Sequence, residues 1–303
     1  MTTSILPPLP YADWADTRDT LHLFLQIIGK IRLEAHPKLN HWWHVTLYPS
    51  VRGLTTGRIP YGDASFEIEF DMIGHNIVVS RNDGRSTSFD VTGKTVALFY
   101  QCLITCLTDL DIAVSIHPVP YENKSKEPFP KDDAPRTYDK NAVSDYWRAL
   151  CRIATIFEVF RSRFNGKQTP VQLYWHSFDL VVTRFSGKTH PLEGGTNSDK
   201  EAYSHEVISI GFWPGDDSFQ QAAFYGYAYP EPAGLFDTPL RPDEASWAQK
   251  NGGALAVLTY EAFRAAPDPK KALLAFLESV YKNAGETARW PLDDFAHVAA
   301  RKN

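Results

Sequence analysis

The chain has 303 residues, of which 43% are hydrophobic and 13% aromatic, so it can bury a substantial core and we expect a folded protein. Its formal net charge is −5, with acidic and basic residues interspersed, and since no basic stripe could follow phosphates, we expect no nucleic-acid partner. No apolar run is long enough to span a bilayer, and the N-terminus lacks the pattern of a signal peptide, so a cytoplasmic protein with no membrane partner is predicted.

The three cysteines, Cys102, Cys106 and Cys151, all fall in segments with helical patterning. An odd number of thiols in expected helices favours reduced, buried side chains in a reducing compartment. A cysteine nucleophile is therefore not expected.

In the first part of the chain, a helix is predicted over 17–32, where apolar residues repeat at helical spacing. A strand is predicted over 41–48. Residues 66–72 alternate apolar and acidic side chains, which predicts a half-buried strand of an antiparallel sheet. The further elements expected here are a strand over 77–79, a hairpin turn over 82–84, a helix over 95–107 and a strand over 112–116.

Residues 118–140 are rich in proline and charge, which predicts a linker. The elements expected after it are a helix over 138–164, strands over 171–185, 203–212, 222–229 and 254–258, and a helix over 269–281. The order of helix, strands and helix thus occurs once on each side of the linker.

A repeated motif supports a relation between the two sides. Trp43-His44 and Trp175-His176 each follow a long amphipathic segment, and an arginine, Arg52 or Arg184, stands eight positions after each histidine. We therefore predict an α+β fold of two similar halves, each an antiparallel sheet packed against helices, with a possible internal duplication. The alternative is a single mixed fold in which the two Trp-His pairs coincide by chance.

The predicted organisation has an N-terminal half over 1–117, the linker over 118–140 and a C-terminal half over 141–303. Both halves are expected to pack as one unit.

Histidines near the repeated motif are the first candidates for a site. On a strand, His41 and His44 would point to opposite faces, so they could not bind one metal ion, and His44 is the preferred pocket residue. If the halves are related by a pseudo-twofold axis, His44 and His176 would approach each other and could hold a divalent transition metal. The alternative is that both are structural histidines hydrogen-bonded to backbone carbonyls.

His205 and Glu206 form a second candidate, for a catalytic role. Glu206 shares a strand face with apolar residues, so it must be paired, protonated or functional, which makes it a possible general acid or base. An ion pair with Arg52 or Arg184 explains the same pattern equally well. The His-Glu pair does not start a zinc-protease helix, because Ser209 stands where the second histidine is required.

A tyrosine-rich strand offers candidate ligand contacts. Tyr225 and Tyr227 fall on one face, and such tyrosines either line clefts for flat ligands or form plain core. With them, Arg52 and Arg184 are candidates for binding a carboxylate or phosphate group of the ligand.

No nucleotide cofactor is expected. The triplets at 93–95 and 187–189 read Gly-Lys-Thr, but the glycine that a phosphate-binding loop needs five positions earlier is replaced by Ser88 and Val182. No dinucleotide-binding glycine pattern is present either.

Six short motifs follow one another along the chain: Leu9-Pro-Tyr11 with Trp14, Thr20-Leu-His22, Asn40-His-Trp-Trp-His-Val45, Tyr203-Ser-His-Glu-Val207, Gly211-Phe-Trp-Pro-Gly215 and Tyr227-Ala-Tyr-Pro-Glu-Pro-Ala-Gly234. Together they resemble a bacterial family catalogued only as a domain of unknown function, over about residues 9–281. The resemblance implies one complete family unit rather than a fusion. It implies no activity and assigns no catalytic residue.

Two functional hypotheses follow. The first is binding or hydrolytic turnover of a small organic ligand in an aromatic cleft between the halves, lined by the histidines, arginines and glutamate named above; a bound metal would then supply an activated water. The second is a non-catalytic structural or interaction module in which these residues belong to the core. Nothing in the sequence sets the oligomeric state.

Overall fold

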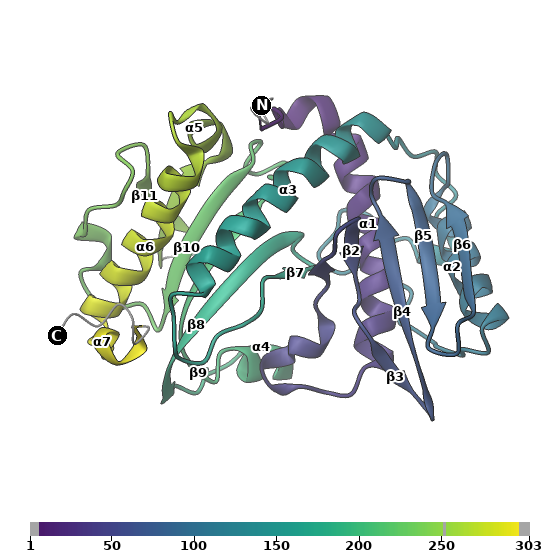
Figure 1. Ribbon diagram of the computed structural model, residues 1–303, viewed down its shortest axis with the longest axis horizontal. Coiled ribbons are helices and arrows are strands. Elements are labelled where there is room, and N and C mark those ends of the chain that lie inside the picture. The colour runs from purple at the N-terminus through teal and green to yellow at the C-terminus, as the bar shows by residue number, and fades with distance from the viewer. Residues whose placement is uncertain (1–5, 251–252, 297–303) are drawn as a thin grey trace.

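Two antiparallel sheets with helices packed on them make up the fold (Figure 1), in a computed structural model that describes residues 6–250 and 253–296. The first sheet has the strand order β1-β2-β4-β5-β6, and β3 pairs with β4. Its strands are β1 (Tyr48–Pro49), β2 (Gly53–Thr55), β3 (Ile59–Tyr61), β4 (Ala64–Asp71), β5 (Asn76–Arg81) and β6 (Ser86–Asp90). The predicted α+β class is confirmed.

The second sheet has the order β11-β12-β10-β9-β8-β7. Its strands are β7 (Gln172–Tyr174), β8 (Asp179–Thr189), β9 (His205–Trp213), β10 (Ala223–Tyr229), β11 (Ser246–Lys250) and β12 (Gly253–Thr259). The two sheets meet edge to edge, because Leu47 beside β1 and Leu173 in β7 exchange two backbone hydrogen bonds, of 2.9 and 2.7 Å.

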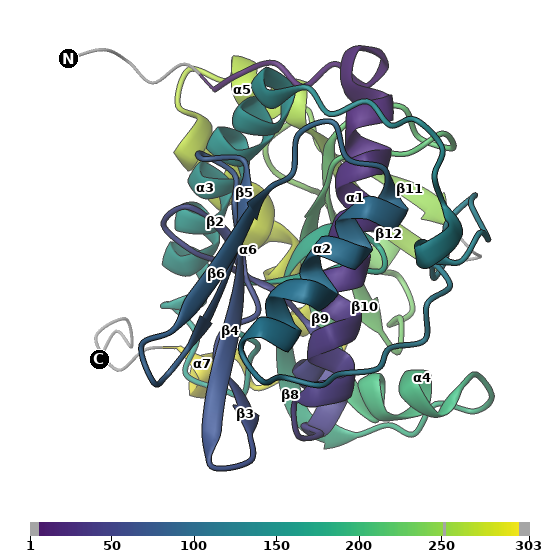
Figure 2. The ribbon, with the colours of Figure 1, turned by 90° about the vertical axis from the view of Figure 1, so that its right-hand side faces the viewer.

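Helices cover the sheets on defined faces. α3, α5 and α6 pack on one face of the second sheet, and α1 with α2 packs against the first (Figures 1 and 2). The helices are α1 (Tyr11–Ala35), α2 (Val96–Asp109), α3 (Lys140–Arg161), α4 (Asn197–Ala202), α5 (Tyr260–Ala265), α6 (Pro269–Thr287) and α7 (Leu292–Phe295), with the short 3-10 turns η1 (Asn40–Val45), η2 (Phe129–Lys131) and η3 (Leu235–Asp237). None of the helices in the described part of the chain is long and apolar enough to cross a membrane.

Local sequence signals explain the main elements. In β4 the apolar members of the alternating pattern, Phe66, Ile68 and Phe70, are fully buried, as predicted. α6 begins with Pro269 in its first turn after Asp268, whose side chain accepts a hydrogen bond from a backbone N–H of that turn. Thr95 caps α2 in the same way.

Two predicted strands are wrong. Residues 40–45 form η1 instead of a strand, with His41 and Trp42 in the left-handed backbone region (φ 53° and 59°). The alternation of side chains that assigned His41 and His44 to opposite faces therefore does not apply. Residues 112–116 have no regular structure, although Ile112 and Ile116 are buried; burial produced the apolar pattern without strand pairing.

The two Trp-His pairs do not occupy equivalent places. Trp43-His44 lies in η1, whereas Trp175-His176 lies in the turn between β7 and β8. Arg52 precedes β2 and Arg184 lies in the middle of β8. The motif thus gives no support to an internal duplication.

The proline-rich segment 118–140 packs on the rest of the fold. Phe129 is fully buried, and the carbonyl of Asp132 accepts the backbone N–H of Ala97 in α2 at 3.0 Å. Buried residues from both sides of this segment belong to one continuous core. The division into two halves stays a prediction.

Candidate ligand-binding cavity

A cavity of about 370 Å³ lies between the second sheet and α1. The sheet forms its floor through β7, β8, β9 and β10. Its other walls are Lys30 and Leu33 of α1, η1, Tyr121 from the proline-rich segment, and α4. Residues from both sides of the proline-rich segment therefore contribute to it.

Strand alternation decides which side chains form the floor. Every second residue faces the cavity, while the residues between them face α3 and α6. The floor consists of Asp179, Val181, Thr183 and Phe185 from β8, Val207 and Ser209 from β9, and Tyr225 and Tyr227 from β10.

Tyr225 lies across β9 to reach β8. Its cross-strand partner is Gly211, and a Cβ there would lie 2.5 Å from the Tyr225 hydroxyl, so only glycine leaves room for the ring. The Tyr225 hydroxyl donates to Asp179, whose other carboxylate oxygen accepts from Ser177 at 2.5 Å. Burial and the Asp179 charge hold the pKa of Tyr225 well above its ordinary value, so this hydroxyl stays protonated at neutral pH.

Two pairs of hydroxyl groups line the cavity, one on the floor and one between the floor and the end of α4. The Oγ1 of Thr183 and the Oγ of Ser209 lie 2.9 Å apart, and the hydroxyls of Tyr203 and Tyr227 lie 2.8 Å apart. Burial raises the pKa of both tyrosines. Each pair uses one hydroxyl hydrogen internally, which leaves further donor and acceptor capacity for a ligand.

Trp175 fixes the side of the cavity nearest α1. Its indole N–H donates to the carbonyl of Val45 at 2.6 Å. The ring lies against Gly29 of α1, where a Cβ would come within 2.0 Å of Trp175 Cδ1. The ammonium of Lys30 lies 5.8 Å from the centre of the Trp175 ring.

A group of basic side chains stands beside the cavity at η1. The Nζ of Lys167 donates to Nε2 of His41 at 2.6 Å, and the rings of His41 and His205 lie 5.1 Å apart. Burial, followed by the nearby Lys167 charge, lowers the pKa of His41. Since Nε2 accepts from Lys167, the neutral ring carries its proton on Nδ1, 3.1 Å from the carbonyl of Glu201.

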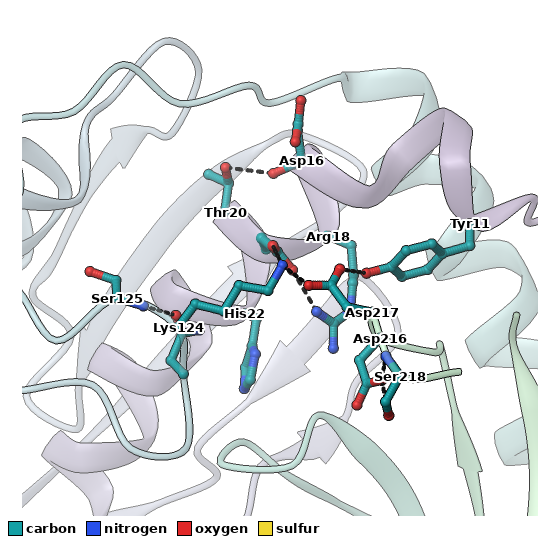
Figure 3. Close-up of polar contacts among 12 residues, drawn as sticks. Tyr11, Asp16, Arg18, Thr20, His22, Lys124, Ser125, Asp216, Asp217 and Ser218 are labelled. Carbon is teal, nitrogen blue, oxygen red and sulfur yellow. Dashed lines mark hydrogen bonds and ion pairs between the residues drawn. The ribbon is translucent and has the colours of Figure 1, made fainter. Parts of the chain in front are cut away.

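A polar network holds the segment that carries Tyr121 (Figure 3). The Tyr11 hydroxyl donates to Asp217 at 2.8 Å, and Asp217 also pairs with Lys124. Gln26 of α1 bonds to both the backbone N–H and the carbonyl of Tyr121, at 2.7 and 2.8 Å. Together these contacts fix Tyr121 at the cavity.

Three of the predicted ligand-binding residues line the cavity: Tyr225, Tyr227 and His176. His176 packs among Tyr121, Tyr174 and Trp175. Burial lowers its pKa, so its ring is neutral at pH 7.

His44 and Arg52 lie outside the cavity lining, contrary to their predicted role. His44 is buried in η1, packs on Trp42 and accepts the backbone N–H of Leu39 at 3.3 Å. Arg52 forms an ion pair with Asp71 in the first sheet, at 2.6 Å. The η1 turn decides the position of His44, and pairing with the first sheet decides that of Arg52. The repeated motif predicted neither.

Arg184 faces the opposite side of the second sheet. It is buried, its guanidinium lies 3.6 Å from the centre of the Phe160 ring and 4.2 Å from that of Tyr281, and it donates to the Phe160 carbonyl at 2.7 Å. Burial lowers the pKa of Arg184 to about 10. The residue therefore belongs to the packing of α3 and α6 on the sheet.

We expect Arg184→Met to change the free energy of unfolding by about 1 kcal/mol or less, because an apolar side chain of similar length replaces a costly buried cation. Urea denaturation measures this value. Ligand affinity should stay at the wild-type level. A large loss of ligand affinity with unchanged stability would show that Arg184 contacts the ligand after all.

Glu206 and His205 also lie outside the cavity lining. Glu206 faces away from the floor, toward Ile208 and Ala228, and its nearest ion-pair partner among the described residues is Lys188 at 3.9 Å, not an arginine. His205 bonds through Nδ1 to the Ser204 hydroxyl at 3.0 Å. Neither side chain is therefore positioned to act on a ligand in the cavity.

No cluster of three or more His, Cys, Asp or Glu side chains suited to a metal ion occurs within residues 6–250 and 253–296. His44 and His176 have separate surroundings, so the predicted metal pair is not formed.

Sequence reasoning missed Asp179, Lys30 and the Thr183–Ser209 pair. The alternation of β8 places Asp179 and Thr183 on one face, a signal that was available in the sequence. For Lys30 no signal existed, because it stands in a helix that is buried on nearly all sides.

The chain belongs to a family of unknown function, DUF5996, whose model matches residues 6–297. The predicted resemblance is thereby confirmed. No curated protein and no solved structure matches the chain.

Proposed function

We propose that this protein binds one small organic molecule with a flat, partly apolar body in the cavity between the second sheet and α1. A volume of about 370 Å³ lies within the range of small-molecule sites, roughly 300–1,000 Å³. The observation that carries the proposal is the lining of the cavity: paired hydroxyl groups stand among aromatic rings over one sheet face, under walls supplied by α1, η1, the proline-rich segment and α4.

The cavity offers a ligand two kinds of contact. Aromatic rings of Trp43, Phe185 and Tyr227 give flat apolar surface. The hydroxyl pairs and Asp179 supply hydrogen bonds that fix the orientation of the ligand. Such a site binds a hydroxylated or amide-bearing aromatic ring better than an aliphatic chain.

The cytoplasmic location and the internal duplication stay predictions.

A panel of small aromatic compounds with hydroxyl, amide or carboxylate groups, including 4-hydroxyphenylacetate and 4-hydroxyphenylacetamide, tests the proposal by calorimetry and thermal shift. We expect Tyr225→Phe to weaken binding of a panel member about tenfold, the effect of one lost hydrogen bond. Product analysis after incubation shows whether a bound compound is also hydrolysed.

Tyr281→Phe is the matched control, because it removes a buried tyrosine hydroxyl on the opposite face of the sheet. Its affinity should equal that of the wild type. If no panel member binds, or if both variants bind like the wild type, these residues serve only the core, as a structural or interaction module requires.

A further inference from the structure

Lys30 is a buried cation that faces the cavity. The residue is only 7% exposed, it lines the cavity, and its ammonium lies 5.8 Å from the centre of the Trp175 ring. Gly29, the preceding residue, allows α1 to come close enough to Trp175 for this contact. The tertiary packing therefore directs an amine into the wall of the cavity beside Trp175.

No acidic side chain among the described residues pairs with the Lys30 ammonium. Within the described part of the chain, no ion pair or hydrogen bond involves the Lys30 ammonium; the nearest acidic influence comes from Glu34, one turn further along α1. Two exposed lysines near the cavity do have an anion: Lys38 pairs with Glu201 at 2.6 Å, and Lys124 pairs with Asp217. Among the described residues, the ring of Trp175 is the contact that stabilises the Lys30 charge, and such a contact is weaker than a pair with an anion.

The two carboxylates that line the cavity are already occupied. Asp179 accepts hydroxyl hydrogen bonds from Ser177 and Tyr225. Asp199 accepts the backbone N–H and the hydroxyl of Thr196, at 2.9 and 2.8 Å, in the capping box of α4. The protein itself thus leaves the Lys30 ammonium available to a ligand.

We propose that the ligand is an aromatic carboxylate whose carboxylate group pairs with Lys30 while its ring lies over the tyrosine floor. This inference rests on the proposed function and names the ligand class of the same cavity. A carboxylate would supply an anion for Lys30, and a charge-assisted hydrogen bond between ammonium and carboxylate is stronger than one between neutral groups.

The basic group at η1 is the competing position for the carboxylate. Lys167 also has no carboxylate partner in the described residues, but its Nζ already donates to His41. Its side chain is exposed, and it does not line the cavity. Lys167→Met is therefore the matched control for Lys30→Met.

The experiment compares dissociation constants, by calorimetry at one ionic strength, of 4-hydroxyphenylacetate and its uncharged analogue 4-hydroxyphenylacetamide. We expect the wild type to bind the acid at least tenfold more tightly than the amide. Lys30→Met should abolish this preference and leave amide binding intact, whereas Lys167→Met should retain it. The melting temperature of free Lys30→Met should equal or exceed that of the wild type, because no ion pair is lost.

Each other outcome overturns the inference in a recognisable way. If the amide binds as tightly as the acid in the wild type, the cavity binds ligands but selects no carboxylate. A preference that persists in Lys30→Met, or that Lys167→Met removes, assigns the carboxylate to another cation. If neither probe binds, the inference fails, and the proposed function fails with it only when the other members of the panel do not bind either.

Discussion

Gly29→Ala should destabilise the protein by about 3 kcal/mol, although alanine is the better helix former by about 1 kcal/mol. The reason is the contact between α1 and Trp175: a Cβ at position 29 would lie 2.0 Å from Cδ1 of an indole that is itself held by a hydrogen bond to Val45. Neither a helix backbone nor a buried ring can move away cheaply. Urea denaturation measures the change in unfolding free energy.

Gly285→Ala is the matched control in another helix. There the added Cβ would meet the terminal methyl of Leu292 at 2.5 Å, and such a flexible end can rotate away. Stability should stay within about 1 kcal/mol of the wild type. In a Trp175→Ala background, Gly29→Ala should no longer destabilise. A Gly29→Ala protein as stable as the wild type would show that α1 does not approach Trp175 so closely.

Acidification from pH 6.5 to 4 should remove about 3 kcal/mol of stability through His22 alone. Burial, followed by the Arg18 charge, lowers the pKa of His22 from 6.5 to about 4. The unfolded chain therefore binds a proton that the folded protein rejects throughout this window. Stability is complete above pH 6.5 and falls as the pH decreases toward the folded-state pKa.

Urea denaturation at half-unit pH intervals measures this dependence. Burial also lowers the pKa of His41, His44 and His176, so the loss in the wild type should exceed the share of His22. His22→Gln removes the titrating group, so it should reduce the loss of stability between pH 6.5 and 4 by the contribution of His22. If His22→Gln and the wild type give parallel profiles, His22 is not buried as a neutral ring.

Periodic patterns correctly predicted those helices and strands whose conformation is set by residues close together in the chain. The alternation at 66–72 gave β4, and the proline at 269 marked the start of α6. In β10 the alternation of tyrosines with small residues correctly placed Tyr225 and Tyr227 on one face, which is the cavity face. These signals succeed because backbone hydrogen bonding and burial act on residues close together in the chain.

Predictions that depended on a repeated motif failed. Trp43-His44 and Trp175-His176 share two residue types, but one pair lies in a 3-10 turn with left-handed neighbours and the other in a tight turn. Two residues cannot specify a backbone conformation, since the packing of distant segments selects it. The assignment of His44 to a pocket failed with the strand on which it depended.

The sequence alone determined the α+β class, most of the helices and strands, and the face on which the tyrosines of β10 stand, because each depends on a local period. Tertiary structure alone decided that α1 closes over the second sheet through Gly29 and Trp175, that Arg184 turns toward α3, and that Lys30 faces the cavity. The contacts of Gly29 and Lys30 with Trp175 join residues more than a hundred positions apart. The orientation of Arg184 depends on which helices pack on each face of β8. The candidate site is therefore a property of the packing, and its chemistry follows from which charges that packing leaves unpaired.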